Sequence, residues 1–249
     1  MLRSLSIVFH NGRQFIPDIR GTKLAPPFRG LPRIRRVRAD DKKIAAFCPV
    51  GAISTEPLSI DLGKCVFCGE CAFAFPEKIS FTSDHVISTN IRERLIVKEG
   101  DELPVKTDRD SVRKDIKRIC GRSLKLREIS AAGDNSAEWE MTASGNVQFD
   151  MSRFGIEFVA SPKHADGIVI TGPISENMAE AVDICYEATA DPQIIILAGT
   201  DAISGGIFKD STALKREFLE KHKIDLYIPG NPPHPLTIIN GLIDLMNWD

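Results

Sequence analysis

Four cysteines between residues 48 and 71 constrain this chain more than any other feature. Three of them, Cys65, Cys68 and Cys71, recur every third residue, and the fourth, Cys48, precedes a proline. Zinc sites favour two C-x2-C pairs set well apart, and buried structural cysteines usually stand alone. Three cysteines at every third position with a remote Cys-Pro are instead typical of a [4Fe–4S] cluster. The spacing therefore favours one [4Fe–4S] cluster bound by these four residues over a zinc site or a set of core thiols.

The same spacing predicts that a second cluster site has been lost. In bacterial ferredoxins the run C-x2-C-x2-C-x3-C-P occurs twice, and the fourth cysteine of each run binds the cluster of the other run. Here the second run has Phe75 at its fourth position, and counting back from Cys48 gives Ile44, Asp41 and Arg38. The missing ligands all belong to one cluster, so we expect one complete site and one deleted site.

The composition is that of an ordinary soluble globular protein. The chain of 249 residues is 43% hydrophobic and has a mean hydropathy of -0.09, which leaves room for one large or two modest domains. No run approaches the roughly 20 apolar residues of a membrane-spanning helix, and the N-terminus lacks a signal-peptide layout. Six cysteines, four of them spaced for metal, indicate a reducing cytoplasm. We expect the other two, Cys120 and Cys185, to be core thiols.

The first 37 residues are expected to form an extended basic arm, broken by prolines and glycines. Asp18 is the one acidic residue before Asp40, whereas the residues before Asp40 include many basic ones: Arg3, Arg13, Arg20, Lys23, Arg29, Arg33, Arg35, Arg36 and Arg38. Such an arm could meet nucleic acid, anionic lipid or an acidic partner. Interspersed apolar residues and the lack of a nucleic-acid-binding motif favour an arm that lies across partner subunits near a membrane surface.

The cysteines define a small α+β ferredoxin-like domain over residues 38–90. Short helices are expected after each cysteine run, with short strands around Ile53, 58–61 and 79–82. Residues 91–107 are interpreted as a connector. A helix is predicted over 108–126, because apolar residues recur there at helical spacing.

The pattern changes to alternating strands and helices in the last 100 or so residues. Continuous apolar runs predict buried strands at 167–171 and 194–198, with further short strands at 154–160 and 225–228. Helices are predicted over 176–190, 212–221 and 236–246, and a glycine-rich turn over 199–206. This order predicts a doubly wound, flavodoxin-like, mostly parallel sheet, whose ligand-bearing loops lie at the carboxyl ends of the strands.

A series of short phrases in residues 108–249 resembles the small, cluster-bearing subunit of complex I and of the membrane-bound, energy-converting NiFe hydrogenases. The phrases are Cys120-Gly121-Arg122-Ser123-Leu124, Arg153-Phe154-Gly155-Ile156, Ser161-Pro162-Lys163-His164-Ala165-Asp166, Thr171-Gly172-Pro173, Asn177-Met178, Ser204-Gly205-Gly206-Ile207-Phe208 and Tyr227-Ile228-Pro229-Gly230-Asn231-Pro232-Pro233. The run Phe28-Arg29-Gly30-Leu31-Pro32 and the cysteine unit are similar to the ferredoxin-like subunit of the same complexes. The resemblance implies two neighbouring subunits joined in one chain.

The resemblance also implies a cluster that this chain has lost. The small subunit of that family binds a [4Fe–4S] cluster through four cysteines, and the matching positions here are Asn135, Glu138, Asp201 and Asn231. Amide and carboxylate oxygens are poor ligands for an iron–sulfur cluster. Two alternatives follow: these residues hydrogen-bond one another and water in a vacated pocket, or they bind Mg²⁺ or Ca²⁺. The sequence favours the first.

The sequence thus predicts an electron-transfer subunit without catalytic residues, carrying one [4Fe–4S] cluster. The resemblance implies a hydrogenase-like or complex I-like large subunit and membrane subunits as partners, no nucleic acid, and peripheral attachment at the cytoplasmic face of the membrane. The alternative is a structural adaptor in which the remaining cluster is structural or senses redox state.

Overall fold

The central sheet of the computed structural model has five parallel strands. The structure describes residues 2–12, 14–101 and 104–247. The strands are β6 (Leu124–Ser130), β7 (Ile156–Phe158), β8 (Gly167–Thr171), β9 (Ile194–Ala198) and β10 (Leu226–Ile228). Their order is β10-β9-β8-β6-β7 and every pairing is parallel. Numbered along the chain this is the 2-1-3-4-5 order of flavodoxin-like sheets, so the predicted fold class is confirmed.

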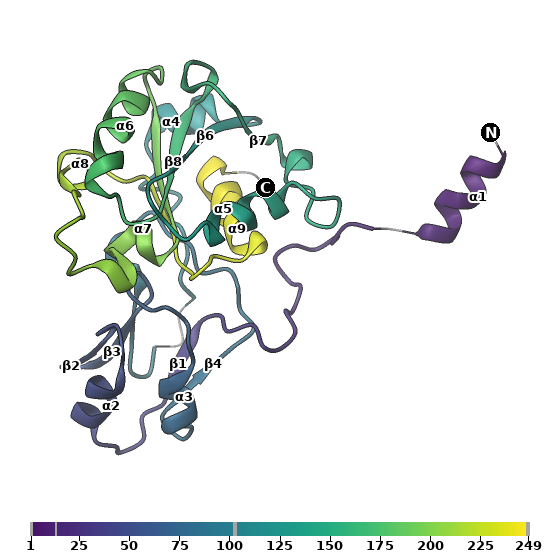
Figure 1. Ribbon diagram of the computed structural model, residues 1–249. Coiled ribbons are helices and arrows are strands. Elements are labelled where there is room, and N and C mark those ends of the chain that lie inside the picture. Colours follow the sequence, from purple (N-terminus) through teal and green to yellow (C-terminus); the bar gives the residue numbers. More distant parts are fainter. Residues whose placement is uncertain (1, 13, 102–103, 248–249) are drawn as a thin grey trace.

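Helices cover both faces of this sheet (Figure 1). Alternate residues of β8 point to opposite faces: Ile168 and Ile170 join one buried cluster, and Val169 joins another. The Val169 face is covered by α4 (Lys114–Ile119), α5 (Ser136–Ser144) and α9 (Pro235–Met246). The opposite face is covered by α6 (Glu176–Glu187), α7 (Thr200–Ser204) and α8 (Glu217–Lys221).

The N-terminal half contains two small antiparallel sheets. One pairs β1 (Pro32–Ile34) with β4 (Ile79–Phe81), and the other joins β2 (Ile53–Thr55), β3 (Leu58–Asp61) and β5 (Ile96–Lys98). The strands predicted near residues 53, 58–61 and 79–82 are confirmed. The helices are α2 (Asp41–Phe47), α3 (Glu70–Ala74) and the 3-10 turn η1 (Arg92–Leu95).

The two predicted helices of the cysteine unit are displaced relative to the sequence prediction. We expected a helix after each cysteine run, but α2 ends immediately before Cys48. The second, α3, begins at Glu70 and therefore contains Cys71. The backbone turns left-handed at Gly69, with a φ of 81°, so the helix begins inside the cysteine run.

The cysteine unit and the α/β unit share one hydrophobic core. A single buried cluster contains Leu62 and Cys65 from the first unit and Ile170, Leu197 and Ile203 from the second. Burial of apolar surface between the units therefore fixes the cysteine loop against one face of the sheet.

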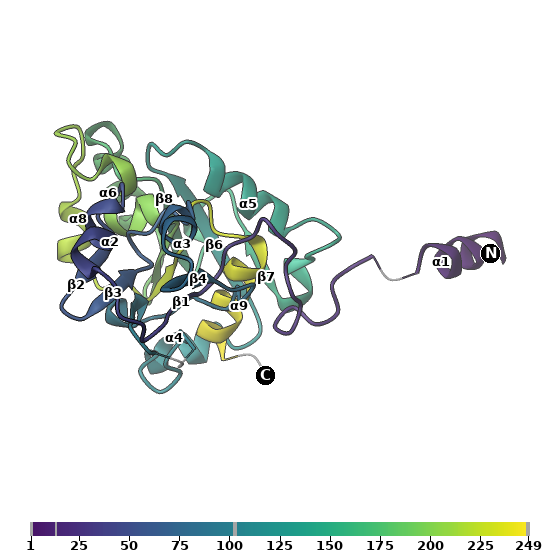
Figure 2. The same ribbon diagram turned by 90° about the horizontal axis from the view of Figure 1, so that it is seen from below.

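Helix α1 (Leu2–Asn11) stands away from the rest of the molecule at the end of an extended segment (Figures 1 and 2). Its described apolar side chains are exposed, and Phe9 reaches 84% exposure. The arm was expected to be extended, so this helix was not predicted. No helix in the described part of the chain combines the length and apolar character needed to cross a membrane.

The largest error of the sequence prediction is the helix over residues 108–126. Only Lys114–Ile119 is helical, and Leu124–Ser130 is strand β6. Helix α5 was not predicted, and α8 covers Glu217–Lys221 instead of residues 212–221. The predicted strands β8 and β9 and helix α9 are confirmed. Three 3-10 turns complete the chain: η2 (Met151–Phe154), η3 (Pro162–His164) and η4 (Gly206–Phe208).

Candidate functional site: a four-cysteine pocket and a polar pocket

The four predicted ligand cysteines line one pocket. The rest of its lining is apolar apart from a glycine and consists of Pro49, Val50, Ala52, Ile53, Ile60, Val66, Gly69 and Phe81. Cys65 is buried, Cys48 and Cys71 are half-buried, and Cys68 is exposed. The thiols come from three places: the end of α2, the loop after β3, and the first turn of α3. The fold thus brings residues that are up to 23 positions apart to a single site.

Backbone amides point at two of these sulfur atoms. The N–H of Ala52 donates to Cys48 Sγ at 3.3 Å, and the N–H of Phe67 donates to Cys65 Sγ at 3.3 Å. Burial raises the pKa of Cys65 to about 12 and that of Cys71 to about 11, and the neighbouring thiolates add to both shifts. These two cysteines are therefore neutral thiols at ordinary pH, and they become thiolates when a positively charged centre binds.

The donor set consists of four cysteines, which are the ligands that a [4Fe–4S] cluster takes. Among the residues that the structure describes, no three His, Cys, Asp or Glu side chains are grouped as they would be around one metal ion. In a [4Fe–4S] cluster each iron binds one cysteine thiolate. The four thiolates therefore bind four separate irons and do not converge on a single ion. Four cysteines line one apolar pocket, and two of their sulfurs accept backbone N–H groups, which is a donor set that suits such a cluster.

A second, polar pocket lies at the carboxyl edge of the parallel sheet. Glu138, Asp201 and Asn231 line it, together with residues that follow β8, β9 and β10, and no described lining residue is a cysteine. Asn135, the fourth position implied by the resemblance, is not among the lining residues; it has a left-handed φ of 69° and precedes α5. Its neighbours Asp134 and Ser136 line the pocket instead.

The carboxylate of Glu138 has hydrogen-bond partners within the protein. The hydroxyls of Ser130 and Thr171 each donate to Glu138 Oε1 at 2.6 Å, and the residue is 8% exposed. The expectation that the four polar residues hydrogen-bond one another is therefore not met at Glu138. Its partners come from the ends of β6 and β8, and no cue in the sequence pairs them with Glu138.

Asp201 lies in the same pocket, but its carboxylate has fewer hydrogen-bond partners than that of Glu138. Burial raises its pKa, and the negative charges of Asp134 and Glu138 add to the shift, while Arg216 opposes it. Asp201 Oδ1 is buried without a hydrogen-bond partner in the described structure. Arg216 donates to the backbone carbonyls of Asp201 and Ala202, at 3.2 and 2.7 Å, so it holds helix α7 through its backbone.

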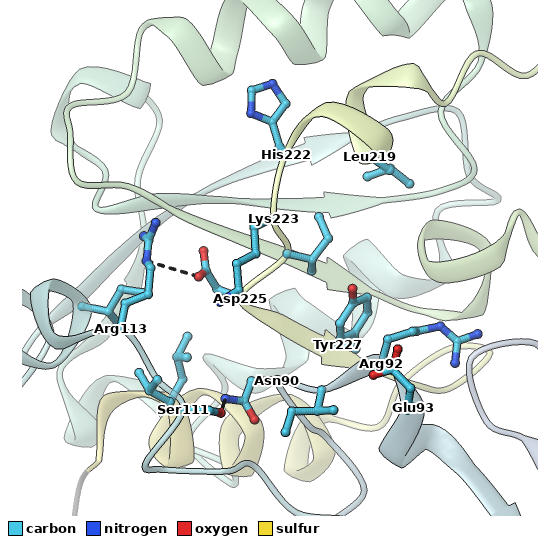
Figure 3. A pocket seen from close by; sticks show the side chains of 15 residues that line it. Asn90, Arg92, Glu93, Ser111, Arg113, Leu219, His222, Lys223, Asp225 and Tyr227 are labelled. Carbon is cyan, nitrogen blue, oxygen red and sulfur yellow. Dashed lines mark hydrogen bonds and ion pairs between the residues drawn. The ribbon is translucent and has the colours of Figure 1, made fainter.

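A further pocket, of about 370 Å³, opens beside β10 (Figure 3). Two of its charged groups are engaged in the fold: Arg113 Nε lies 3.4 Å from Asp225 Oδ1, and Arg113 also donates to the carbonyl of Gln193. The backbone N–H of Ile195 donates to Asp225 Oδ2 at 3.0 Å. Asp225 precedes β10, so this pocket is not at the carboxyl edge where doubly wound sheets bind ligands. We assign it no reaction.

The parallel sheet and the polar pocket at its carboxyl edge define a flavodoxin-like domain, to which the cysteine unit is joined through a shared core. The profile of the family described as "NADH ubiquinone oxidoreductase, 20 Kd subunit" matches residues 135–245. A relative from Pyrococcus furiosus, "Probable membrane-bound hydrogenase subunit mbhJ", is 31% identical over 140 residues, which is 55% of this chain and 84% of the relative. The chain therefore belongs to this family of 20 kDa subunits.

Two further proteins are similar to parts of this chain. An NADH-quinone oxidoreductase subunit of Citrifermentans bemidjiense is 38% identical over 108 residues, covering 43% of this chain and 63% of that protein. A chain in the structure of "the membrane-bound sulfane sulfur reductase (MBS), an archaeal respiratory membrane complex" is 30% identical, with a TM-score of 0.45 over 53% of this chain and 72% of that chain. The family match begins at residue 135, so the cysteine unit lies outside it.

Proposed function

We propose that this chain is the iron–sulfur electron-transfer subunit of a membrane-bound oxidoreductase complex of the hydrogenase or complex I type. It carries one [4Fe–4S] cluster, held by Cys48, Cys65, Cys68 and Cys71. The observation that carries this proposal is that all four thiols line one apolar pocket. When bound, such a cluster accepts and passes single electrons. The chain's own residues surround it with apolar side chains and donate N–H groups to its thiolates.

The small-subunit cluster of the family is absent in this proposal. The corresponding pocket has oxygen donors, and Glu138 is already hydrogen-bonded by two hydroxyls. Hard oxygen donors match sulfide-bridged iron poorly. The polar pocket is therefore a remnant of the family's site, in which a hydrogen-bonded Glu138 stands at one of the former ligand positions.

The chemistry on a substrate belongs to partner subunits, and no catalytic residue is assigned here. The glycine-rich segment 199–206 was predicted to be a turn, but Thr200–Ser204 forms helix α7. The segment also lacks the Gly-Lys-Ser/Thr ending of a phosphate loop. Exposed apolar residues near the polar pocket support a large partner at this edge: Trp139 on α5 is 72% exposed, and Ile207 and Phe208 on η4 are exposed as well. Aromatic and apolar residues exposed in this way are typical of protein interfaces.

The N-terminal arm is proposed to reach the cytoplasmic face of the membrane. Helix α1 has four described apolar side chains exposed, Leu5, Ile7, Val8 and Phe9, and it contains no acidic residue. Basic residues follow along the arm. An apolar helix without acids, followed by basic residues, suits an anionic lipid surface. In this arrangement residues 38–90 are the cluster domain and 108–249 the small-subunit domain. The cluster domain also takes in β1 from the end of the arm (1–37) and β5 from the connector (91–107).

A second candidate function is a structural adaptor in which the cluster no longer passes electrons to the complex. The polar pocket favours it, because a missing centre at that place lengthens the path from the cysteine site to the partner. In that case the cluster stabilises the N-terminal unit or senses the redox state of the complex.

One experiment separates the two. The native complex is purified anaerobically, the cluster is reduced and reoxidised, and the activity of the complex is followed with wild-type chain and with Cys68→Ser. Electron transfer predicts a reversible cluster signal and a loss of activity in the variant. The adaptor predicts full activity whenever the chain is folded and assembled.

A further inference from the structure

Arg29 lies across the loop that carries Cys68. Its Nε donates to the carbonyl of Phe67 at 2.6 Å. A Cβ placed on Gly69 would lie only 2.9 Å from Arg29 Cδ and 3.1 Å from Nε, so the side chain packs directly on that glycine. Phe67 and Gly69 flank Cys68, and a pocket of about 200 Å³ is lined by both Arg29 and Cys68. The guanidinium therefore sits at the exposed corner of the four-cysteine site.

The loop is shaped to receive this side chain. Phe67 has a φ of 52° and Gly69 a φ of 81°, so the backbone is left-handed on both sides of Cys68. The N–H of Phe67 is held by Cys65 Sγ, and its ring is buried against Phe81 with centroids 6.2 Å apart. One peptide unit away from that sulfur contact, the carbonyl of Phe67 accepts from Arg29. Glycine at position 69 leaves the space that the arginine stem occupies.

The positive charge of Arg29 is not neutralised by an acidic residue of the four-cysteine pocket or of the pocket that Arg29 lines. Among the described residues, none that lines the four-cysteine pocket or the Arg29 pocket is Asp or Glu. Glu70, the nearest acid in the sequence, is exposed. An arginine stays charged at all accessible pH values. Each electron that enters a thiolate-bound cluster adds negative charge, so a fixed positive charge nearby lowers the free energy of the reduced state more than that of the oxidised state.

We propose that Arg29 is a positioning residue that sets the reduction potential of the cluster. It fastens the Cys68 loop through Phe67 and keeps a positive charge at the exposed corner of the site, which makes the cluster easier to reduce. This inference rests on the proposed cluster at Cys48, Cys65, Cys68 and Cys71. Because Arg29 is exposed, its charge is partly screened and its influence falls as salt rises.

The test is a potentiometric titration of the cluster in the anaerobically purified full chain, with iron measured in each sample. Arg29→Gln is expected to shift the potential to a more negative value, and Arg29→Lys, which keeps the charge, to restore most of the shift. Arg36→Gln removes an equal charge from the same arm at Gly100, where Arg36 packs, and should leave the potential unchanged. The difference between wild type and Arg29→Gln should shrink as ionic strength is raised.

An Arg29→Gln protein with full iron content and an unshifted potential would overturn the inference. If the glutamine variant binds less iron, Arg29→Met supplies the comparison, because its aliphatic stem still covers Gly69. Loss of iron in both variants would also contradict the inference and make Arg29 a folding residue only. A wild-type chain without any cluster would instead refute the proposed function, so the two failures are distinguishable.

Discussion

The hydroxyl of Thr200 donates a 2.9 Å hydrogen bond to the backbone carbonyl of Cys65, 135 residues away in the chain. Thr200 begins α7 at the carboxyl end of β9, and both residues are buried. The same hydroxyl lies 3.1 Å from the carbonyl of Gly230, in the loop after β10. One side chain thus connects the cysteine loop to the edge of the sheet that carries the polar pocket.

Replacing Thr200 by valine should destabilise the protein by about 1–3 kcal/mol, because the carbonyl of Cys65 loses a buried donor. Urea denaturation followed by circular dichroism measures the change. Thr200→Ser keeps the hydroxyl and serves as the matched control, with a smaller loss expected. Equal stability of the valine variant and the wild type would show that the two units do not depend on this bond.

The stability of the fold should depend on His234 between about pH 6.5 and about pH 4. His234 accepts a hydrogen bond from the N–H of Leu236 at the start of α9, and its ring contacts Phe28 and Phe149. Burial, with a smaller effect from His85, lowers the pKa of His234 to about 4. The folded pKa lies below the unfolded value of about 6.5. The neutral ring therefore stabilises the fold above about pH 6.5, and this contribution is lost as the pH falls towards 4.

The measurement is urea denaturation of wild type and His234→Asn at several pH values in that range. Asparagine also accepts a hydrogen bond at a helix N-terminus, but it does not titrate. The free energy of unfolding of the wild type should fall more steeply on acidification than that of the variant. Parallel pH profiles would contradict the assignment of a depressed pKa to this histidine.

Helix α1 should bind vesicles that contain anionic lipid. Among the side chains of the helix whose burial is described, Phe9 is the most exposed large apolar one, and burying a phenylalanine contributes about 1.5–3 kcal/mol. Phe9→Asp should therefore weaken vesicle binding by about tenfold or more. Ile184→Asp makes the same kind of change at an exposed position on α6, and vesicle binding should be unaffected. Vesicle flotation measures this binding. Binding that does not change with Phe9→Asp, or that does not depend on anionic lipid, would argue against a membrane-facing arm.

Neutralising the polar pocket should leave the iron content unchanged. The double variant Glu138→Gln/Asp201→Asn removes both charges and keeps the shapes of the side chains, so the pocket remains packed. Iron determination on the anaerobically purified variant tests this. A large loss of iron would mean that the pocket supports a second centre.

The sequence predicted the parts of the fold that are determined by local pattern. The strands β8 and β9 are uninterrupted apolar runs, and every residue of each is buried. Strand β6 was missed because its buried residues Leu124, Leu126 and Ile129 do not alternate strictly and follow an apolar helical repeat. Helix α5 was missed because it buries Glu138 and exposes Trp139, the reverse of the usual pattern.

In the candidate site, too, the sequence predicted what depends on local spacing and missed the contacts between distant segments. Cysteine spacing was enough to predict four residues that line one pocket, since three of them lie within seven consecutive positions. The contacts of Thr200 with Cys65 and of Arg29 with Phe67 join segments 135 and 38 residues apart. Contacts of this kind are fixed by tertiary packing, so no local pattern could predict them.

The most direct test of the account is the number of iron and acid-labile sulfide atoms per chain in anaerobically purified wild type and Cys65→Ser. One cubane at the four cysteines predicts about four of each in the wild type and loss of most of both in the variant. About eight of each, or about four that survive Cys65→Ser, would contradict it.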